Sequence, residues 1–438
     1  MRRFVPGLPA VLIALALFAP AAARGQAPAV LSLEEQARVC DGWLRERLTV
    51  LLPELMRRER IDMWLVVCEE YNEDPVYLSL VPFASLSARR LTMLVMFDRG
   101  GEKGVERFSV NRYGLGDLFP TVWKAGEEDQ WRTLAEAVRA RDPKRIGIDE
   151  SDVFAFGDGL SASKKARLVQ ALGPEYAKRL VSAERLAVGW LERRLPAEIE
   201  AYHHICAVAH AVIAEAFSNA VITPGLTTTS DVEWWFWEKF RALGQTTWFA
   251  PSVEVQRPAS SPYKDSPVIH RGDLLHCDVG INYLRLNTDT QQHAYVLRPG
   301  ETDAPAGLKA ALAQGNRLQD ILLGEMKEGL TGNQVLAAAL KRAKDEGLRP
   351  SIYTHPLGVH GHAAGPTIGL WDRQGGVPGA GDYPLHPDTV FSIELNVQAS
   401  VPEWNGQDVR IALEQDAAFT RSGTVFLDRR QTELVLVR

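Results

Sequence analysis

The segment HCDVGINYLRLNTD, residues 276–289, decides the fold of this chain. We interpret it as a β-hairpin that reverses near Tyr283 and Leu284. With that reversal Asp278 and Asp289 lie directly opposite each other, with both side chains on one face. Two carboxylates so close repel each other in a partly buried site, and a divalent cation between them removes that cost. The hairpin therefore suggests a metal site, and two unrelated surface aspartates are the simpler alternative.

The composition is that of a globular protein with more than one domain. The chain has 438 residues, of which 46% are hydrophobic and 24% charged, and its formal net charge is -6. This length suits two domains better than one. No block rich in Lys and Arg stands out, so nucleic acid is not an expected partner. The four cysteines are scattered and favour buried free thiols over a disulfide framework.

The first residues have the pattern of a secretory signal peptide. A basic start at residues 1–3 precedes an apolar run from Ala10 to Phe18 and the small residues Ala21–Ala23. The apolar run is shorter than the roughly 20 residues that span a bilayer, and no later segment is long and apolar enough to span one. We assign residues 1–27 to a signal peptide and expect an exported protein, periplasmic or secreted, without a membrane span when mature.

Two domains are expected after this segment. Predicted strands at 63–68, 91–97 and 145–149 alternate with helical patterns, which indicates a small α/β domain over residues 32–187. A capping box at Ser32–Glu35 opens its first helix, which runs toward Leu52.

A second domain is expected over residues 190–438. Its predicted helices are followed by strand-like segments at 389–398 and 408–420, an order that indicates an α+β class. The helices are expected from Pro196 to Phe217, Ser230 to Leu243, Ala306 to Met326 and Asn333 to Asp345.

Histidines and acids gather in this second domain. The segment THPLGVHGH, residues 354–362, holds three histidines, and Glu394 and Glu414 each interrupt an apolar run. An acid inside an apolar strand is costly unless it is paired or bound to metal. The alternative for each glutamate is an edge strand with its acid in water. With the hairpin, the domain offers two Asp, at least one His and two Glu in chain order.

These motifs resemble the pita-bread metallopeptidases, which include aminopeptidase P, prolidase, methionine aminopeptidase and the metal-free relative creatinase. The resemblance covers nearly the whole mature chain and implies a C-terminal pita-bread domain behind a smaller α/β domain. It implies two divalent cations and five metal ligands: Asp278, Asp289, His355, Glu394 and Glu414. His355, Gly358 and His362 match the spacing of the family's histidine motif. In an alternative register His360 is the ligand, but Thr367 then stands where the second histidine belongs.

Roles for further residues follow from the same resemblance. Glu394 would also carry the proton during catalysis, and His362 would hydrogen-bond the tetrahedral intermediate. His360 and Arg410 are candidate substrate contacts. A ligand set of carboxylates with one imidazole suits Mn²⁺, Zn²⁺, Co²⁺ or Fe²⁺, and its oxygen-rich character favours Mn²⁺.

The chain departs from the family around the substrate. The segment Phe249–Arg257 lacks the usual histidine, Ala363 replaces an acid, and Thr290–His293 lacks the usual arginine. Residues 363–382 look like an inserted loop near the site. His293 either substitutes for a missing group or is a satisfied structural histidine.

Three functional hypotheses follow. The first is an exopeptidase on short peptides, of the Xaa-Pro aminopeptidase or dipeptidase type. The second is a hydrolase of a non-peptide C–N bond on the same fold, and the third is a metal-binding protein without peptidase activity. The resemblance also implies a homodimer.

Overall fold

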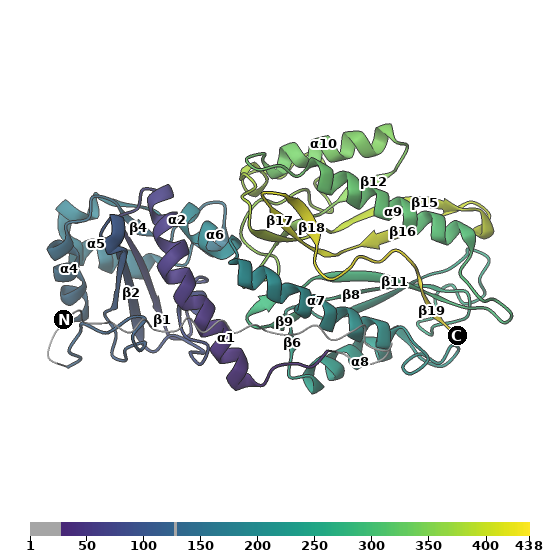
Figure 1. The fold of residues 1–438 in the computed structure, drawn as a ribbon, viewed down its shortest axis with the longest axis horizontal. Coiled ribbons are helices and arrows are strands. Elements are labelled where there is room, and N and C mark those ends of the chain that lie inside the picture. Colours follow the sequence, from purple (N-terminus) through teal and green to yellow (C-terminus); the bar gives the residue numbers. More distant parts are fainter. Residues whose placement is uncertain (1–27, 127–128) are drawn as a thin grey trace, which may run out of the picture.

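The computed structural model describes residues 28–126 and 129–438, so the predicted signal peptide lies outside the described residues. The chain forms two parts that lie side by side, with the helix α7 beginning where they meet (Figure 1). Among the described residues, no helix is both long and apolar enough to cross a membrane.

The N-terminal part is a five-stranded sheet between two layers of helices. Its strand order is β3-β2-β1-β4-β5, with β4 and β5 parallel to β1. Successive side chains of β1 point to opposite faces, so Leu65 belongs to one hydrophobic core and Trp64 to the other. The elements are β1 (Met63–Glu69), β2 (Leu91–Asp98), β3 (Val105–Ser109), β4 (Ile146–Ile148), β5 (Leu180–Ser182), α1 (Leu33–Glu46), α2 (Leu52–Arg58), α3 (Tyr77–Leu80), α4 (Gln130–Arg141), α5 (Ala162–Ala177) and α6 (Glu184–Glu192). The expected α/β arrangement is confirmed.

The first helix departs from its prediction at the far end. The capping box at Ser32 and Glu35 is present. The helix does not stop at Leu52, however. A π-helical turn over Arg47–Leu51 joins α1 to α2, which continues to Arg58.

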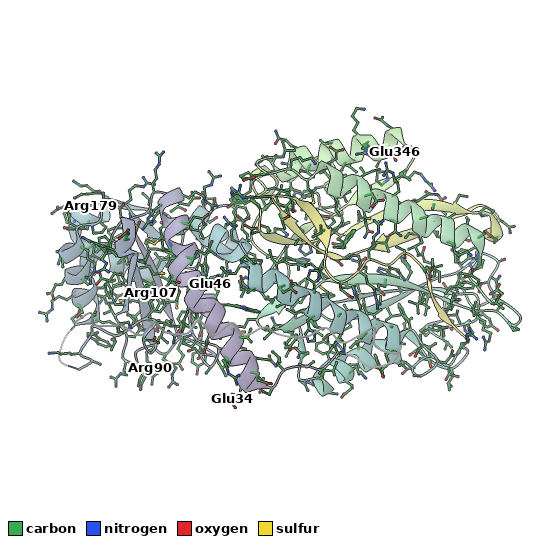
Figure 2. The ribbon with its side chains drawn as sticks, viewed as in Figure 1. Glu34, Glu46, Arg90, Arg107, Arg179 and Glu346 are labelled. Atoms are coloured by element: carbon green, nitrogen blue, oxygen red, sulfur yellow. The ribbon has the colours of Figure 1, made fainter. Side chains whose placement is uncertain are left out.

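The C-terminal part has four helices outside and curved sheets inside. The helices α7 (Pro196–Ala216) and α8 (Thr229–Ala242) pack on the sheet β19-β11-β8-β7, while α9 (Ala306–Glu325) and α10 (Gly332–Asp345) pack on β12-β15-β16. Glu346, labelled in Figure 2, accepts hydrogen bonds from Arg317 of α9 at 2.7 Å and ties the end of α10 to that helix. The strands are β6 (Thr246–Thr247), β7 (Ser252–Gln256), β8 (Leu274–Val279), β9 (Ile281–Tyr283), β10 (Leu286–Asn287), β11 (Thr290–Val296), β12 (Pro350–Ile352), β13 (His355–Leu357), β14 (Thr389–Ser392), β15 (Leu395–Val401), β16 (Gln407–Leu413), β17 (Asp416–Thr420), β18 (Gly423–Phe426) and β19 (Val435–Val437). The α+β class is confirmed, and all four cysteines are free and buried.

The deciding hairpin is present, but its predicted register is wrong. The reversal falls at Leu284 and Arg285, which both have positive φ, of 56° and 58°. A two-residue hairpin loop of this kind needs positive φ at both positions. As a result Asp278 pairs with Gln291 rather than with Asp289. The two aspartates are diagonal neighbours on one face, which still brings their side chains together.

The two predicted late strands each divide into two. The segment predicted at 389–398 breaks between β14 and β15, at Glu394, and the segment predicted at 408–420 breaks between β16 and β17, at Glu414. The pair β14–β17 belongs to one sheet and the pair β15–β16 to another. Each glutamate therefore lies where its strand leaves one sheet for the next.

Candidate metal centre

The structure brings the five predicted ligands together. Three overlapping groups each have ligand atoms within 4.8 Å of one another: Asp278, Asp289 and Glu414; His355, Glu394 and Glu414; and Asp289, His355 and His362. The aspartates come from the ends of the hairpin, His355 opens β13, and the glutamates come from the two strand breaks. Elements far apart in sequence thus converge on a single acidic cluster.

His355 is oriented as a metal-ligating histidine would be. Its Nδ1 lies 3.0 Å from the carbonyl oxygen of Pro356, to which it donates, so Nε2 carries the lone pair. Nε2 is buried without a hydrogen-bond partner. It faces Asp289 Oδ2 at 3.5 Å and Glu414 Oε1 at 3.7 Å. A backbone acceptor on one ring nitrogen commonly fixes the other toward a metal.

The carboxylates are close enough to oppose each other's ionisation. Burial, followed by the charge of Glu414, raises the pKa of Asp278 and of Asp289 well above the usual range. The same two causes raise the pKa of Glu394. The buried oxygens Asp278 Oδ1 and Asp289 Oδ1 have no hydrogen-bond partner. Such a cluster is stable as a set of anions only with a cation among its members.

The donor set fits a divalent cation on the side of His355. An unpartnered imidazole nitrogen and the oxygens of Asp289 and Glu414 converge there, and Glu394 belongs to the same group. Oxygen with one nitrogen is a set that Mn²⁺ and related ions accept. On the side of Asp278 the geometry differs, because the side-chain amide of Gln291 lies among the carboxylates.

The other histidines of the motif separate by position. The partly exposed His362 has its ring centre 4.6 Å from that of His355, and its Nε2 is 3.4 Å from the Tyr353 hydroxyl. His360 points elsewhere and stacks on Phe156 at 4.4 Å. Burial lowers the pKa of both His360 and His362 to about 4. The structure thus places His355 inside the cluster and His360 outside it.

His293 is a structural residue. Its Nδ1 lies 3.0 Å from the carbonyl oxygen of Leu275, and its Nε2 accepts from the amide of Ala412 at 3.1 Å. Because both ring nitrogens are used and the side chain is fully buried, it does not replace a missing substrate contact. Arg410 is half-exposed and pairs with Glu254 at 3.7 Å, near the acidic cluster rather than inside it.

A cavity of about 220 Å³ opens beside the cluster. Tyr353, His355 and His362 line it from the C-terminal part, and Phe154 and Phe156 line it from the N-terminal part. Members of the predicted inserted loop, including Ala363 and Leu370, also line it, as expected. The cavity is therefore lined by both parts of the chain.

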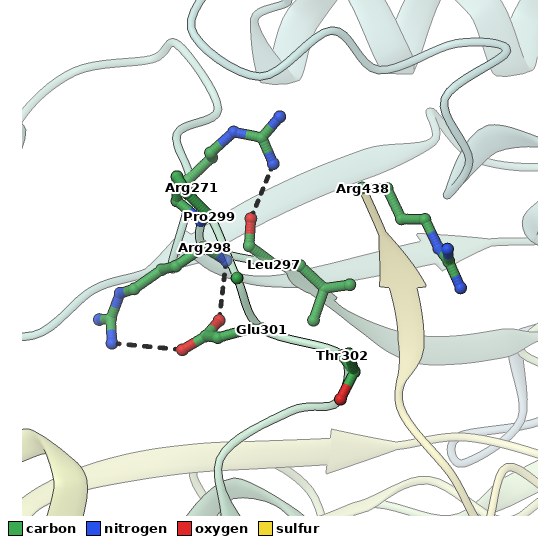
Figure 3. Close-up of a pocket in the computed structure, with 8 residues that line it drawn as sticks. Arg271, Leu297, Arg298, Pro299, Glu301, Thr302 and Arg438 are labelled. Atoms are coloured by element: carbon green, nitrogen blue, oxygen red, sulfur yellow. Dashed lines mark hydrogen bonds and ion pairs between the residues drawn. The ribbon is translucent and has the colours of Figure 1, made fainter.

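A larger cavity of about 340 Å³ lies elsewhere and contains none of the candidate ligands. In it Arg271 donates to the carbonyl oxygen of Leu297 at 2.8 Å, and Arg298 pairs with Glu301 at 3.8 Å (Figure 3). Both of these arginines are engaged with the chain's own groups, and the cavity lies apart from the acidic cluster.

Comparison with known proteins assigns the chain to a family. The model described as metallopeptidase family M24 matches residues 200–420, about half of the chain. The chain belongs to metallopeptidase family M24. The matched region of this M24 chain contains all five predicted ligands. A search of curated proteins found no match.

Solved structures share the fold of this M24 chain. An X-Pro aminopeptidase from Thermotoga maritima is 19% identical with a TM-score of 0.62, and the match covers 87% of this chain and 100% of that one. A Xaa-Pro dipeptidase from Bacillus anthracis is 17% identical with a TM-score of 0.60, covering 92% and 100%. A prolidase from Pyrococcus horikoshii is 15% identical with a TM-score of 0.56, covering 87% and 98%. At these identities the likeness establishes the pita-bread fold.

Sequence reasoning missed three residues at the site. Gln291 contacts the carboxylates, Phe156 lines the cavity, and the ring centre of Trp248 lies 5.0 Å from that of His362. Only Gln291 left a signal in the sequence. Its spacing of two from Asp289 places the two side chains on one face of a strand.

Proposed function

We propose that this chain is a metal-dependent exopeptidase that hydrolyses short peptides, of the Xaa-Pro aminopeptidase or dipeptidase type. The observation that carries the proposal is the unpartnered Nε2 of His355, aimed at Asp289 and Glu414 within a cluster of four carboxylates. A divalent cation held by these residues would supply a nucleophile from water at neutral pH and would polarise a carbonyl oxygen. Mn²⁺ is the proposed metal because oxygen ligands predominate.

The remaining residues have roles that their positions support. Glu394 lies at the cluster and faces solvent in part, which suits a group that takes a proton from water and passes it on. His362 stands at the exposed edge of the same cavity, where it can donate to an oxygen that gains charge.

The size of the cavity favours short substrates. About 220 Å³ between Phe156 and the loop at Ala363 leaves room for few residues beyond the bond to be cleaved. Two of the similar structures are an X-Pro aminopeptidase and an Xaa-Pro dipeptidase, and peptides with proline in the second position are the substrate class we propose first.

The test is a peptide-library assay of the full mature chain with Mn²⁺ added. We expect cleavage of dipeptides or tripeptides, abolished by chelator and restored by Mn²⁺. The Glu394→Gln protein serves as the matched control. If Mn²⁺-loaded protein cleaves no short peptide, with or without proline in the second position, the peptidase proposal fails.

We also propose, from the sequence, that the protein is exported and forms a homodimer. The pattern of residues 1–27 supports export, which N-terminal sequencing of the mature protein tests. The resemblance to pita-bread enzymes supports a homodimer, which light scattering tests.

A further inference from the structure

Gln291 lies in the middle of the predicted ligand set. Its Nε2 is 2.8 Å from Glu394 Oε1 and 2.8 Å from Glu414 Oε2. It is also 3.4 Å from Asp278 Oδ2. A primary amide has two hydrogens to donate, so each glutamate receives one. Gln291 is only 2% exposed, so its amide is shielded from bulk water.

The orientation of this amide is held from behind. Its Oε1 is 3.0 Å from His276 Nε2, which donates to it. His276 in turn lies with Nδ1 3.5 Å from Glu254 Oε2. If the amide were reversed, its oxygen would face two carboxylate oxygens at hydrogen-bond distance and repel them. The backbone is held as well, because Gln291 forms a β-bridge to Glu414.

Glu414 divides the cluster into two sides. Its Oε2 accepts from Gln291, while its Oε1 accepts from Ser392 Oγ and faces His355 Nε2. On the His355 side the unpartnered nitrogen supplies a lone pair and no proton. On the Asp278 side the Gln291 amide directs the positive end of its dipole at the carboxylates of Asp278, Glu394 and Glu414.

We infer that the Gln291 amide takes the place of one of the two cations expected in this centre, and that the chain binds a single divalent ion on the His355 side. An amide nitrogen has no lone pair available for a metal, and its hydrogens point at the oxygens a second ion would need. The inference rests on the metal-binding part of the proposed function. It goes beyond that proposal by fixing the number of ions and the residue that sets it.

The experiment counts bound metal rather than activity. Full-length mature protein is dialysed to equilibrium against buffered Mn²⁺, and bound manganese is measured by elemental analysis with an electron paramagnetic resonance spectrum. The wild type is expected to bind one Mn²⁺ with the signal of an isolated ion. Gln291→Ala removes the amide and is expected to bind two, with the spectrum of a coupled pair.

Gln292→Ala is the matched control. Gln292 neighbours Gln291 in β11 but pairs with Cys277, so its side chain points to the other face of the strand. This variant is expected to keep one Mn²⁺. If Gln291→Ala does not fold, Gln291→Ser replaces it in the same measurement, with the same expected count of two.

Two Mn²⁺ ions in the wild type would overturn the inference and leave the peptidase proposal standing, since the amide would then turn aside or ligate through its oxygen. One ion in both the wild type and a folded Gln291→Ala protein would also overturn it. Failure of the proposed function is a separate result, namely no bound metal in any variant or no peptide cleavage by loaded protein.

Discussion

The backbone of Gln291 bridges that of Glu414, with N–H···O distances of 3.1 Å in one direction and 3.4 Å in the other. This bridge joins the sheet β19-β11-β8-β7, which contains the hairpin, to the strand break between β16 and β17. It brings the aspartates of the hairpin to the glutamates of the later strands. The acidic cluster therefore exists only once these two sheets have docked.

His355→Ala is expected to lower the affinity for Mn²⁺ by at least about tenfold. Even residues that only hydrogen-bond a metal ligand typically cost this much when they are replaced. The reason is the loss of the one unpartnered nitrogen that faces Asp289 and Glu414. Titration calorimetry with Mn²⁺ measures it. His360→Ala is the control, because that ring stacks on Phe156 outside the cluster. Weaker binding in His360→Ala alone would show that the register is wrong.

His362→Ala is expected to keep its metal and to lose turnover by roughly 10²–10³, the usual effect of removing a donor to a developing charge. The exposed ring borders the cavity and reaches the Tyr353 hydroxyl. Steady-state kinetics on the best peptide, with manganese content measured in parallel, separate the two effects. Loss of metal would instead make His362 a ligand.

Glu394→Gln is expected to fold normally and to turn over peptide more slowly by a factor of roughly 10²–10⁴. This is the contribution typical of a positioned acid or base. The oxygen of the new amide can still accept from Gln291, which preserves the local hydrogen bond. The amide cannot take up a proton. Circular dichroism and peptide kinetics test this, and a variant with near wild-type turnover would remove Glu394 from the mechanism.

Gly361→Ala is expected to destabilise the chain by about 1–3 kcal/mol, the range for overpacking, and to lower activity. A Cβ there would lie 2.2 Å from the Trp248 ring. Trp248 donates to the carbonyl oxygen of Thr288, the neighbour of Asp289. Gly375→Ala, which meets nothing within 4 Å, is the control in a thermal unfolding comparison. Equal melting temperatures for both variants would contradict the expectation.

Asp149→Asn is expected to remove a pH dependence of stability in the N-terminal part. Burial, with a charge contribution from Asp74, raises the pKa of Asp149 well above its usual range, and burial raises the pKa of Asp74 to about 6. Because the folded values are raised, this stability is present below about pH 4, the unfolded value, and is lost as the pH rises through about 6 and beyond.

Asparagine keeps the acceptor that Trp64 uses at 2.7 Å and a donor toward Asp74. The melting temperature should therefore fall less between pH 5 and pH 8 in the variant than in the wild type. The exposed Asp152→Asn protein is the control. An identical fall in all three proteins would rule out this pair as the source.

Much of the candidate site was readable from the sequence because each ligand leaves a local trace. An acid within an apolar run, as at Glu394 and Glu414, is costly and therefore informative. The spacing between His355 and His362 belongs to one short segment. The alternation of strands and helices in the N-terminal part likewise follows from local patterns, which β1 and β2 confirm.

The tertiary structure decided what depends on pairing across the chain. The hairpin register shifted because Leu284 and Arg285, rather than the preceding pair, adopt positive φ, and Arg285 donates to the carbonyl oxygens of Val81 and Pro82 in the N-terminal part. The position of Phe156 over His360 depends on how the two parts meet. The lining of the cavity by residues of both parts depends on the same contact.

The sequence by itself determined which side chains are available to bind a cation, because composition and spacing are local properties. Only the tertiary structure placed the Gln291 amide between Glu394 and Glu414, because that contact depends on strand register and on the docking of two sheets. Strand register and sheet docking leave no periodic signal in the sequence, because both depend on packing between residues more than a hundred positions apart.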